Sequence, residues 1–299
     1  SRCQREGRGF DPLCPLQKIM IIWVASYPKS GNTYIRSFLS AYYFSKKGKF
    51  EFNQLLNILQ FPSIKFSQKD YFNFKDAAKN WVDNQKFFFE KDNFRFLKTH
   101  NTLNDFQGEK FTTKKHTLGA IYIVRDPRNV ITSMSNHYSF SFEESYNKLM
   151  DKDASLNEKS VNGDCSNFTF LGSWADHYKA WRDNQEFDVL FIKYEDLQNN
   201  KYEIFEKIIN FIDGLKKDYT KFDKIKFENS INSTNFVNLK NKELNEKFDE
   251  SVSSKDGKKI RFFNLGFKNK WQKVLSKNMI EKINKNLKKE LLELNYHKF

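Results

Sequence analysis

Short apolar runs alternate along the chain with longer stretches in which apolar residues recur every three or four positions. Each short run is rich in β-branched or aromatic residues and predicts a buried strand, whereas each longer stretch predicts an amphipathic helix. Strands separated by helices favour βαβ crossovers, and hence an α/β domain in which helices cover both faces of a central parallel sheet. The predicted strands are residues 20–26, 94–98, 118–124 and 188–194, and the predicted helices are residues 32–44, 76–90, 127–138, 142–152, 168–184, 195–212 and 276–296.

This pattern begins at Met20 and continues without a linker or an internal repeat, so we expect a single domain over residues 20–299. Residues 1–19 are rich in Arg, Gly, Pro and Cys, unlike the Lys-, Asn- and Phe-rich remainder. We expect them to be a leader foreign to the native protein, with a natural start at Met20, or a disordered arm. The polar region from Asn229 to Lys259 lacks a strong period and predicts a mobile lid or loop.

The chain is basic, with 51 Lys and Arg against 37 Asp and Glu and a formal net charge of +14. A basic chain favours anionic partners such as nucleotides, nucleic acids or membrane surfaces. Here the lysines are spread along every predicted helix, as on ordinary solvated faces, so charge alone selects no function. No apolar run approaches the ~18 residues of a membrane span, and residues 20–26 are too short for the core of a signal peptide. We therefore expect a cytoplasmic protein.

The most informative stretch is SYPKSGNTYIRSF, which joins the first predicted strand to the first predicted helix. Ligands of open parallel sheets bind at such junctions, where helix N–H groups and the helix dipole attract an anion. Gly31 lets the backbone approach a ligand closely, Ser30 and Thr33 add hydroxyl donors, and Lys29 supplies a full positive charge. The alternative is a capped helix with a turn in front of it, but the combination favours a site for a phosphate-type anion.

This loop is not a Walker A loop, because that pattern places lysine directly after its second glycine, whereas Lys29 precedes Gly31. A kinase would also need Mg²⁺ ligands, and Asp126, between Arg125 and Pro127, is at least as well suited to capping a helix. Neither the cysteines nor the histidines show the spacing of a metal site. These residues are Cys3, Cys14, Cys165, His100, His116, His137, His177 and His297.

Four blocks of the chain, taken together, resemble sulfotransferases that use 3′-phosphoadenosine 5′-phosphosulfate (PAPS). They occur in the order in which that family has them and span most of the chain after Met20. The resemblance implies a P-loop-like α/β domain with a central parallel sheet flanked by helices. The blocks are YPKSGNTY (27–34), LKTHN (97–101), IYIVRDPRNVITSMSNHY (121–138) and VLFIKYEDL (189–197).

The resemblance also implies a role for each matching residue. Lys29 would stabilise the bridging oxygen of the leaving phosphate, and His100 would be the catalytic base. Arg125 and Ser133, eight positions apart, would bind the 3′-phosphate, and Tyr194 would lie near the adenine. The 5′-phosphosulfate loop would consist of Tyr27, Pro28, Lys29, Ser30, Gly31, Asn32, Thr33 and Tyr34.

The chain departs from the family pattern at three places. Asn32 replaces the usual threonine, and Tyr34 replaces the usual tryptophan, which leaves a smaller ring against the adenine. The late block IRFFNLGFKNKW lacks the family's R-K-G triplet. The second clamp on the 3′-phosphate is therefore assigned to Arg261, with Lys259 and Lys268 as alternates.

The expected function is transfer of a sulfuryl group from PAPS to the hydroxyl group of a small molecule or carbohydrate, by in-line displacement. A sulfuryl group carries only about one negative charge, so lysine, hydroxyls and helix N–H groups suffice without a metal. We expect Lys98 to support the site and His137 to lie on a helix surface or to complement the helix dipole. The alternatives are an ATP-dependent small-molecule kinase and a basic nucleic-acid-binding protein; the resemblance disfavours nucleic acid as a partner.

Overall fold

The computed structural model describes residues 20–87, 94–157, 160, 162–217, 222–246, 248, 250–253, 257 and 259–296, and of residues 87, 253 and 259 only the backbone. The leader expected over residues 1–19 lies outside these ranges, so that expectation stays a prediction. His297, for which the sequence predicted no part in a metal site, also lies outside them.

The centre of the domain is a four-stranded parallel sheet with the order β2-β1-β3-β6. Its strands coincide with the four predicted apolar runs to within one residue at each end, and the prediction of a parallel sheet is confirmed. Parallel strands of this kind carry near-continuous apolar sequence because both faces are covered. The strands are β1 Met20–Ser26, β2 Phe94–Thr99, β3 Thr117–Val124 and β6 Val189–Lys193.

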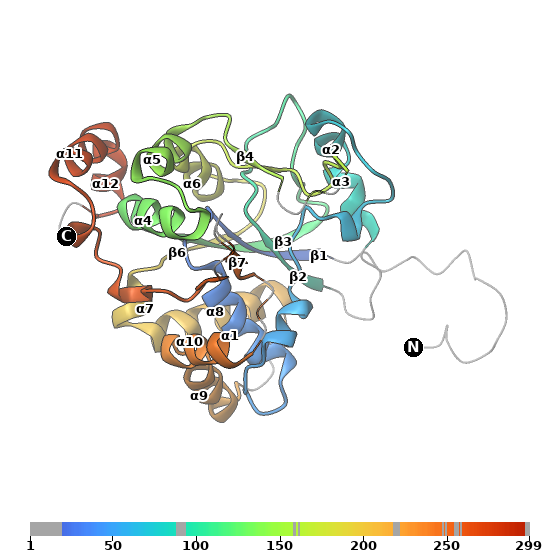
Figure 1. Ribbon diagram of the computed structural model, residues 1–299. Coiled ribbons are helices and arrows are strands. Elements are labelled where there is room, and N and C mark those ends of the chain that lie inside the picture. The colour runs from blue at the N-terminus through green and yellow to red at the C-terminus, as the bar shows by residue number, and fades with distance from the viewer. Residues whose placement is uncertain are drawn as a thin grey trace.

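Helices cover the sheet on both sides (Figure 1), and the alternation of side chains along β1 explains the two cores. Successive side chains of a strand point to opposite faces, so Trp23 points into one core, where it belongs to the same cluster as Trp181 of α6. Val24 points into the other core, with Phe38 of α1 and Phe205 of α8. The helices are α1 Asn32–Phe44, α2 Phe74–Lys79, α3 Trp81–Asn84, α4 Pro127–Tyr138, α5 Phe142–Met150, α6 Trp174–Arg182, α7 Asp196–Asn199, α8 Lys201–Lys216, α9 Lys224–Ser233, α10 Phe236–Asn245, α11 Lys277–Asn286 and α12 Lys288–Glu293.

One of the sequence predictions about helices, residues 168–184, is wrong in part. The helix predicted over residues 168–184 begins only at Trp174, because Gly172 has a left-handed φ of 63° and Ser173 caps the helix through its side chain. Thr169–Phe170 instead form the short strand β5, which pairs antiparallel with β4 (Ser155–Leu156). A second pair of short strands consists of β7 Val252–Ser253 and β8 Lys259–Ile260.

The lid or loop predicted from Asn229 to Lys259 contains the end of α9 and all of α10. Asn235 caps α10 by accepting a hydrogen bond from the backbone N–H of Asn238 at 2.9 Å. Leu239 is fully buried on the inner face of α10. A side-chain cap and the buried Leu239 thus stabilise a helix whose overall composition is polar.

The outer edge of β2 is covered by the segment around Gln60. The backbone N–H of Lys98 donates to the carbonyl of Leu59 at 2.8 Å, and the N–H of Phe61 donates to the carbonyl of Lys98 at 2.8 Å. The resulting parallel bridge between Gln60 and Lys98 adds backbone hydrogen bonds on the outer side of β2, near the carboxyl end of that strand. Among the helices that the structure describes, none has the length and apolar character needed to cross a membrane.

We expect Phe38→Ala to lower the free energy of unfolding by about 3–5 kcal/mol, because Phe38 is fully buried and stacks on Phe205 with ring centroids 3.9 Å apart. Phe72→Ala is the matched control, since that side chain is 74% exposed and should change stability by at most about 0.5 kcal/mol. Urea unfolding measures both values. Equal effects of the two substitutions would contradict the assignment of Phe38 to the core.

Candidate active site

A cavity of about 900 Å³ opens at the carboxyl edge of the sheet. All four strands of a parallel sheet end at the same edge, and for this reason residues from distant blocks of the sequence meet there. The cavity also reaches α4 and the segment that follows β8. The predicted site residues that line it are Pro28, Lys29, Gly31, Asn32, Thr33, Tyr34, His100, Arg125, Ser133 and Tyr194.

Two residues of the predicted phosphosulfate loop, Tyr27 and Ser30, are buried and do not line this cavity. The Tyr27 hydroxyl donates to the backbone carbonyl of Lys148 at 3.3 Å, and its ring packs in the core. The Ser30 hydroxyl has no hydrogen-bond partner within the described part of the chain. Tyr27 therefore supports the loop from below, while Ser30 keeps an unused hydrogen-bonding group within the loop.

The loop after β1 adopts a conformation that requires its glycine. Gly31 has φ 102°, and a Cβ atom at this position would lie 2.3 Å from Cδ2 of Tyr194. Lys29 also has a left-handed φ, 64°, which is uncommon for a residue with a side chain and is typical of functional loops. Both Lys29 and Gly31 therefore have left-handed backbone conformations within the loop that joins β1 to α1.

Asn32, the first departure from the family pattern, uses its amide to hold the loop against the sheet. Its Nδ2 donates to the carbonyl of Val24 at 2.9 Å and to the hydroxyl of Ser26 at 3.2 Å. A threonine hydroxyl could not donate to both. The substitution therefore makes a second tie between the loop and β1.

Arg125, at the end of β3, joins the two predicted anion sites. Its Nη1 donates to the backbone carbonyl of Lys29 at 2.9 Å, and its guanidinium lies 4.6 Å from the ring centroid of Tyr194. Its Nε is buried without a hydrogen-bond partner within the described residues. Ser133, eight residues later on α4, lines the same cavity. The two blocks that the sequence separates by almost a hundred residues form one site.

The neighbouring charges, Asp126 and Arg128, are structural. Asp126 caps α4 by accepting from the Arg128 N–H at 2.9 Å, as predicted, and also forms a buried ion pair with the Arg128 guanidinium at 2.7 Å. That guanidinium in addition donates to the carbonyl of Tyr296 at 2.6 Å. Asp126 is therefore fully engaged, and a kinase in this fold would lack its best candidate for a metal ligand.

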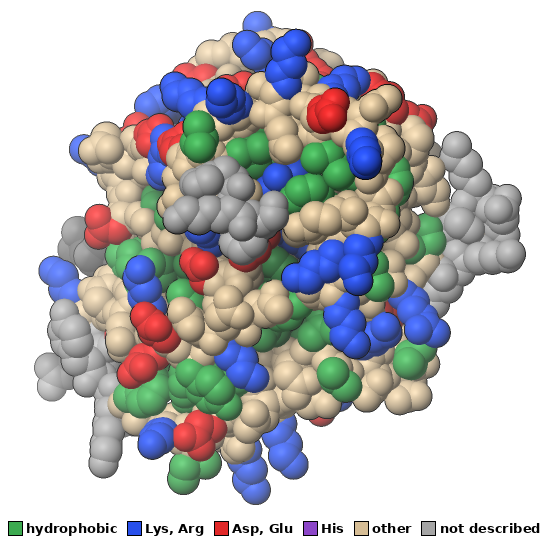
Figure 2. All heavy atoms as spheres, turned by 90° about the vertical axis from the view of Figure 1, so that its left-hand side faces the viewer, with side chains coloured by type: hydrophobic (Ala, Val, Ile, Leu, Met, Phe, Trp, Pro, Cys, Tyr) green, Lys and Arg blue, Asp and Glu red, His purple; other side chains and the backbone are tan. Residues whose placement is uncertain are grey.

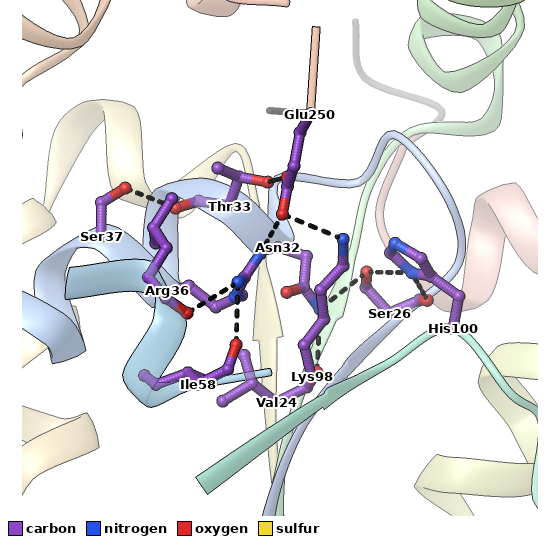
Figure 3. Close-up of polar contacts among 11 residues, drawn as sticks. Val24, Ser26, Asn32, Thr33, Arg36, Ser37, Ile58, Lys98, His100 and Glu250 are labelled. Carbon is purple, nitrogen blue, oxygen red and sulfur yellow. Dashed lines mark hydrogen bonds and ion pairs between the residues drawn. The ribbon is translucent and has the colours of Figure 1, made fainter. Parts of the chain in front are cut away.

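His100 is held in one tautomer at the end of β2 (Figure 3). Its Nδ1 lies 2.7 Å from the backbone carbonyl of Ser26, and a carbonyl oxygen can only accept, so Nδ1 carries the hydrogen. Nε2 then carries the lone pair of the neutral ring. Burial, followed by the positive charge of Lys98, holds the pKa of His100 well below its usual range. The imidazole is therefore neutral at pH 7 and has a nitrogen that can accept a proton.

His177, on α6, positions the backbone of His100 from below. Its Nε2 donates to the His100 carbonyl at 3.0 Å, and its Nδ1 accepts from the hydroxyl of Tyr122 at 2.7 Å. In the sequence His177 stands in a different block from His100, and no local pattern links the two. Burial lowers the pKa of His177 to about 4.

Lys98 is buried at the cavity and faces Glu250, a residue that the sequence did not single out. The Glu250 carboxylate lies 3.5 Å from the Lys98 ammonium, 2.5 Å from the Arg36 guanidinium and 2.9 Å from the Thr33 hydroxyl (Figure 3). Lys98 thus lies in the site, as expected. Glu250 was missed because it stands 217 residues after Thr33, in the polar region predicted to be a lid or loop.

The prediction that His137 lies on a helix surface is wrong. Its side chain is 8% exposed and lines the cavity, with its ring edge-on to Phe262 at 5.6 Å. Burial, followed by the charge of Lys29, lowers the pKa of His137 to about 3. The spacing contained a signal for this position, because His137 follows Ser133 by four residues and therefore shares its face of α4.

An aromatic cluster surrounds the position predicted for the adenine. Tyr194 stacks on Phe267 with ring centroids 4.9 Å apart, and Tyr34 meets Phe267 edge-on at 6.2 Å. Lys29 in turn places its ammonium 4.0 Å from the ring centroid of Phe262. The segment after β8 therefore contributes aromatic rings to the site, whereas the sequence had predicted that it would contribute a basic residue.

Arg261, the first choice for the second 3′-phosphate clamp, is exposed and is not among the residues that line the cavity. Lys268 is likewise exposed and outside the lining, and the Lys259 side chain lies outside the described part of the chain. Among the described residues, no group of three or more His, Cys, Asp or Glu side chains could hold a metal ion.

A parallel sheet with a lysine-bearing loop after its first strand, and an arginine directly after its third, defines a P-loop-like α/β fold. The family model described as "Sulfotransferase domain" matches residues 21–295. The chain therefore belongs to the sulfotransferase domain family, and the resemblance noted in the sequence is confirmed.

Individual relatives are distant. Sulfotransferase 1B1 of Mus musculus is 25% identical over 198 residues, which are 66% of this chain and 61% of that protein. Flavonol 3-sulfotransferase of Flaveria bidentis is 23% identical over 275 residues, 90% of this chain and 81% of that protein.

Solved structures share the fold. A mouse sulfotransferase complexed with PAP superimposes with a TM-score of 0.52 at 16% identity, covering 92% of this chain and 84% of that one. Retinol dehydratase in complex with androsterone and PAP gives 0.55 at 18% identity, covering 91% and 80%.

We expect His177 to make the protein less stable in acid. The unfolded chain, with an ordinary histidine pKa of about 6.5, binds a proton that the folded chain refuses until about pH 4. Stability therefore falls as pH drops from 6.5 towards 4. In His177→Gln, whose amide can still donate and accept, the loss of unfolding free energy between pH 7 and pH 5 should be smaller by about 1–2 kcal/mol. Urea unfolding at both pH values measures it, and an unchanged loss would contradict the assignment.

Proposed function

We propose that this protein transfers the sulfuryl group of PAPS to a hydroxyl group of a small apolar molecule. The observation that carries the proposal is the hydrogen bond from Arg125 to the Lys29 carbonyl, which places both predicted anion sites on one cavity. His100 lines that cavity with a neutral imidazole. Membership of the sulfotransferase domain family supports the same reaction.

The residues present fit the cofactor. The cavity of about 900 Å³ is within the range of pockets that bind nucleotide-sized ligands. Arg125 lines it, and the buried Nε of Arg125 has no partner within the described chain, so a ligand oxyanion would satisfy this group. In this proposal the loop from Lys29 to Thr33 holds the 5′-phosphosulfate, Arg125 and Ser133 hold the 3′-phosphate, and Arg261 remains the prediction for a second clamp.

The chain's own residues then have separate tasks. PAPS, when bound, supplies an activated sulfuryl group with a phosphate as leaving group. Nε2 of His100 accepts the proton of the attacking hydroxyl, because the Ser26 carbonyl keeps the hydrogen on Nδ1. Lys29 places a positive charge where negative charge develops on the leaving oxygen. His177 holds the His100 backbone so that the ring keeps its direction.

The lining of the cavity supports an apolar acceptor. Its wall combines aliphatic and aromatic side chains with polar ones such as Gln60 and Asn167, and the apolar part can hold a hydrocarbon skeleton. Retinol dehydratase, which shares the fold, is described as binding androsterone and retinol. A carbohydrate acceptor and a cytoplasmic location remain predictions from the sequence. The apolar lining residues include Phe52, Leu55, Leu56, Leu59, Ile64 and Tyr138.

The two alternative functions receive less support. A kinase would draw on Asp126, which pairs with Arg128. A nucleic-acid-binding protein would gather its cations in one patch. On the face shown in Figure 2, Lys and Arg side chains are instead interspersed with Asp and Glu.

Nucleotide selectivity tests the proposal most directly. We expect 3′,5′-adenosine bisphosphate to raise the melting temperature of the wild type by several degrees, and ATP with Mg²⁺ to raise it less. Arg125→Ala should weaken binding of the bisphosphate about tenfold or more while changing that of its 3′-dephospho analogue little, because the lost contact is to the 3′-phosphate. A thermal-shift titration measures each value. Preference for ATP with Mg²⁺ would overturn the proposal in favour of the kinase.

Turnover tests the two reacting residues. We expect His100→Ala and Lys29→Ala each to reduce kcat about a hundredfold or more, because one removes the base and the other the charge beside the leaving group. Lys29→Ala should also weaken nucleotide binding. The matched control is Lys47→Ala, an exposed lysine that does not line the cavity. Transfer of ³⁵S from labelled PAPS to a phenol or sterol measures the rates; wild-type turnover in either variant would remove that residue's role.

A further inference from the structure

The Glu250 carboxylate lies inside the anion site formed by the first two strand ends (Figure 3). Its Oε2 accepts from the Thr33 hydroxyl at 2.9 Å, and its Oε1 lies 2.5 Å from Arg36 Nη1 and 3.5 Å from Lys98 Nζ. Thr33 belongs to the loop that the sequence assigned to the 5′-phosphosulfate, Arg36 follows that loop on α1, and Lys98 lies two residues before His100. Glu250 reaches them from the segment between α10 and β7.

Two buried cations surround the Glu250 carboxylate, as they would surround a bound anion. The Arg36 and Lys98 side chains are 4% and 9% exposed, so both cations face the carboxylate in surroundings that water screens poorly. Burial raises the pKa of Glu250, but Lys98 and Arg36 outweigh this effect and hold the pKa well below its usual range. The side chain is therefore a carboxylate at any pH near neutrality.

We propose that Glu250 occupies the place of the cofactor's 5′-phosphosulfate and that nucleotide binding displaces it. The inference rests on the proposed function, which gives Thr33 and the loop around it to the 5′-phosphosulfate. Two anions cannot share these donors, because like charges a few ångströms apart repel strongly in a poorly screened site. Glu250 thus sets both the affinity for the nucleotide and the preference for nucleotides whose 5′ group is negative enough to replace it.

The surroundings of Glu250 allow its side chain to leave without unfolding the segment. Phe248 is anchored by stacking on Phe52 with ring centroids 4.6 Å apart. Ser251 is anchored by donating from its hydroxyl to the carboxylate of Glu243 at 3.1 Å. Phe248 and Ser251 thus have contacts of their own that do not involve Glu250, and the proposal requires only a change of rotamer at Glu250 to release Thr33 and Lys98.

The test compares two nucleotides that differ only at the 5′ position. Adenosine 3′-monophosphate lacks the 5′-phosphate and has no need to displace Glu250, whereas 3′,5′-adenosine bisphosphate does. We expect Glu250→Gln to tighten binding of the bisphosphate about tenfold and to leave binding of the monophosphate within about twofold. The same variant should melt at a lower temperature without nucleotide, because Arg36 and Lys98 lose their counter-ion. Isothermal titration calorimetry and thermal unfolding measure these values.

Glu246→Gln is the matched control, since it removes the same charge from an exposed residue that pairs with Lys242 outside the site. It should leave the ratio of the two affinities unchanged. Weaker or unchanged binding of the bisphosphate by Glu250→Gln would overturn the inference and make Glu250 a purely structural partner of Arg36. If the wild type binds neither nucleotide, the proposed function fails; if it binds both but the ratio does not respond to Glu250, only this inference fails.

A second measurement needs no variant and covers the case in which Glu250→Gln does not fold. In a crystal structure of the wild type with 3′,5′-adenosine bisphosphate, we expect the Thr33 hydroxyl to contact the 5′-phosphate and the Glu250 carboxylate to lie beyond hydrogen-bond distance of it. A Glu250 carboxylate that still accepts from Thr33 beside the bound nucleotide would overturn the inference.

Discussion

The site depends on the hydrogen bond between the Arg125 guanidinium and the Lys29 carbonyl, which ties the end of β3 to the loop after β1. This contact is possible because β1 and β3 are adjacent and parallel, so that their carboxyl ends lie side by side. The carbonyl that accepts this bond belongs to a residue with a left-handed φ, and Gly31, two residues later, leaves room for the ring of Tyr194. An isolated loop would relieve the backbone strain at Lys29, whereas the surrounding structure maintains it at the predicted anion site.

Close to this hydrogen bond, the site contains both ion-paired side chains and histidines whose pKa values are lowered. Glu250 pairs with both Lys98 and Arg36, whereas burial, together with the charge of a nearby lysine, lowers the pKa of His100 and of His137. A neutral imidazole next to cations is the form that can take a proton at neutral pH. The two lysines that lower these pKa values, Lys98 and Lys29, line the same cavity as both imidazoles.

Local sequence was enough to predict the sheet, α1 and α4, because each of these elements has an apolar period and a chemical boundary, such as Asp126 at the start of α4. It also placed Lys29, Arg125 and His100 on one cavity, since each lies within three residues of the end of a strand. Glu250, His177 and Phe267 were out of reach. Their partners are distant in the chain, and only tertiary packing brings a carboxylate from a polar segment onto Thr33.

The covering of β2 by the segment around Gln60 has a consequence for the whole molecule. Edge strands normally expose backbone groups that can recruit another chain, and β2 is the edge strand that leads to His100. Because Lys98 satisfies both of its peptide groups with Leu59 and Phe61, the reactive end of that edge offers no template for intermolecular strand pairing. Strand pairing with another chain is thus blocked at the end of β2 that leads to His100.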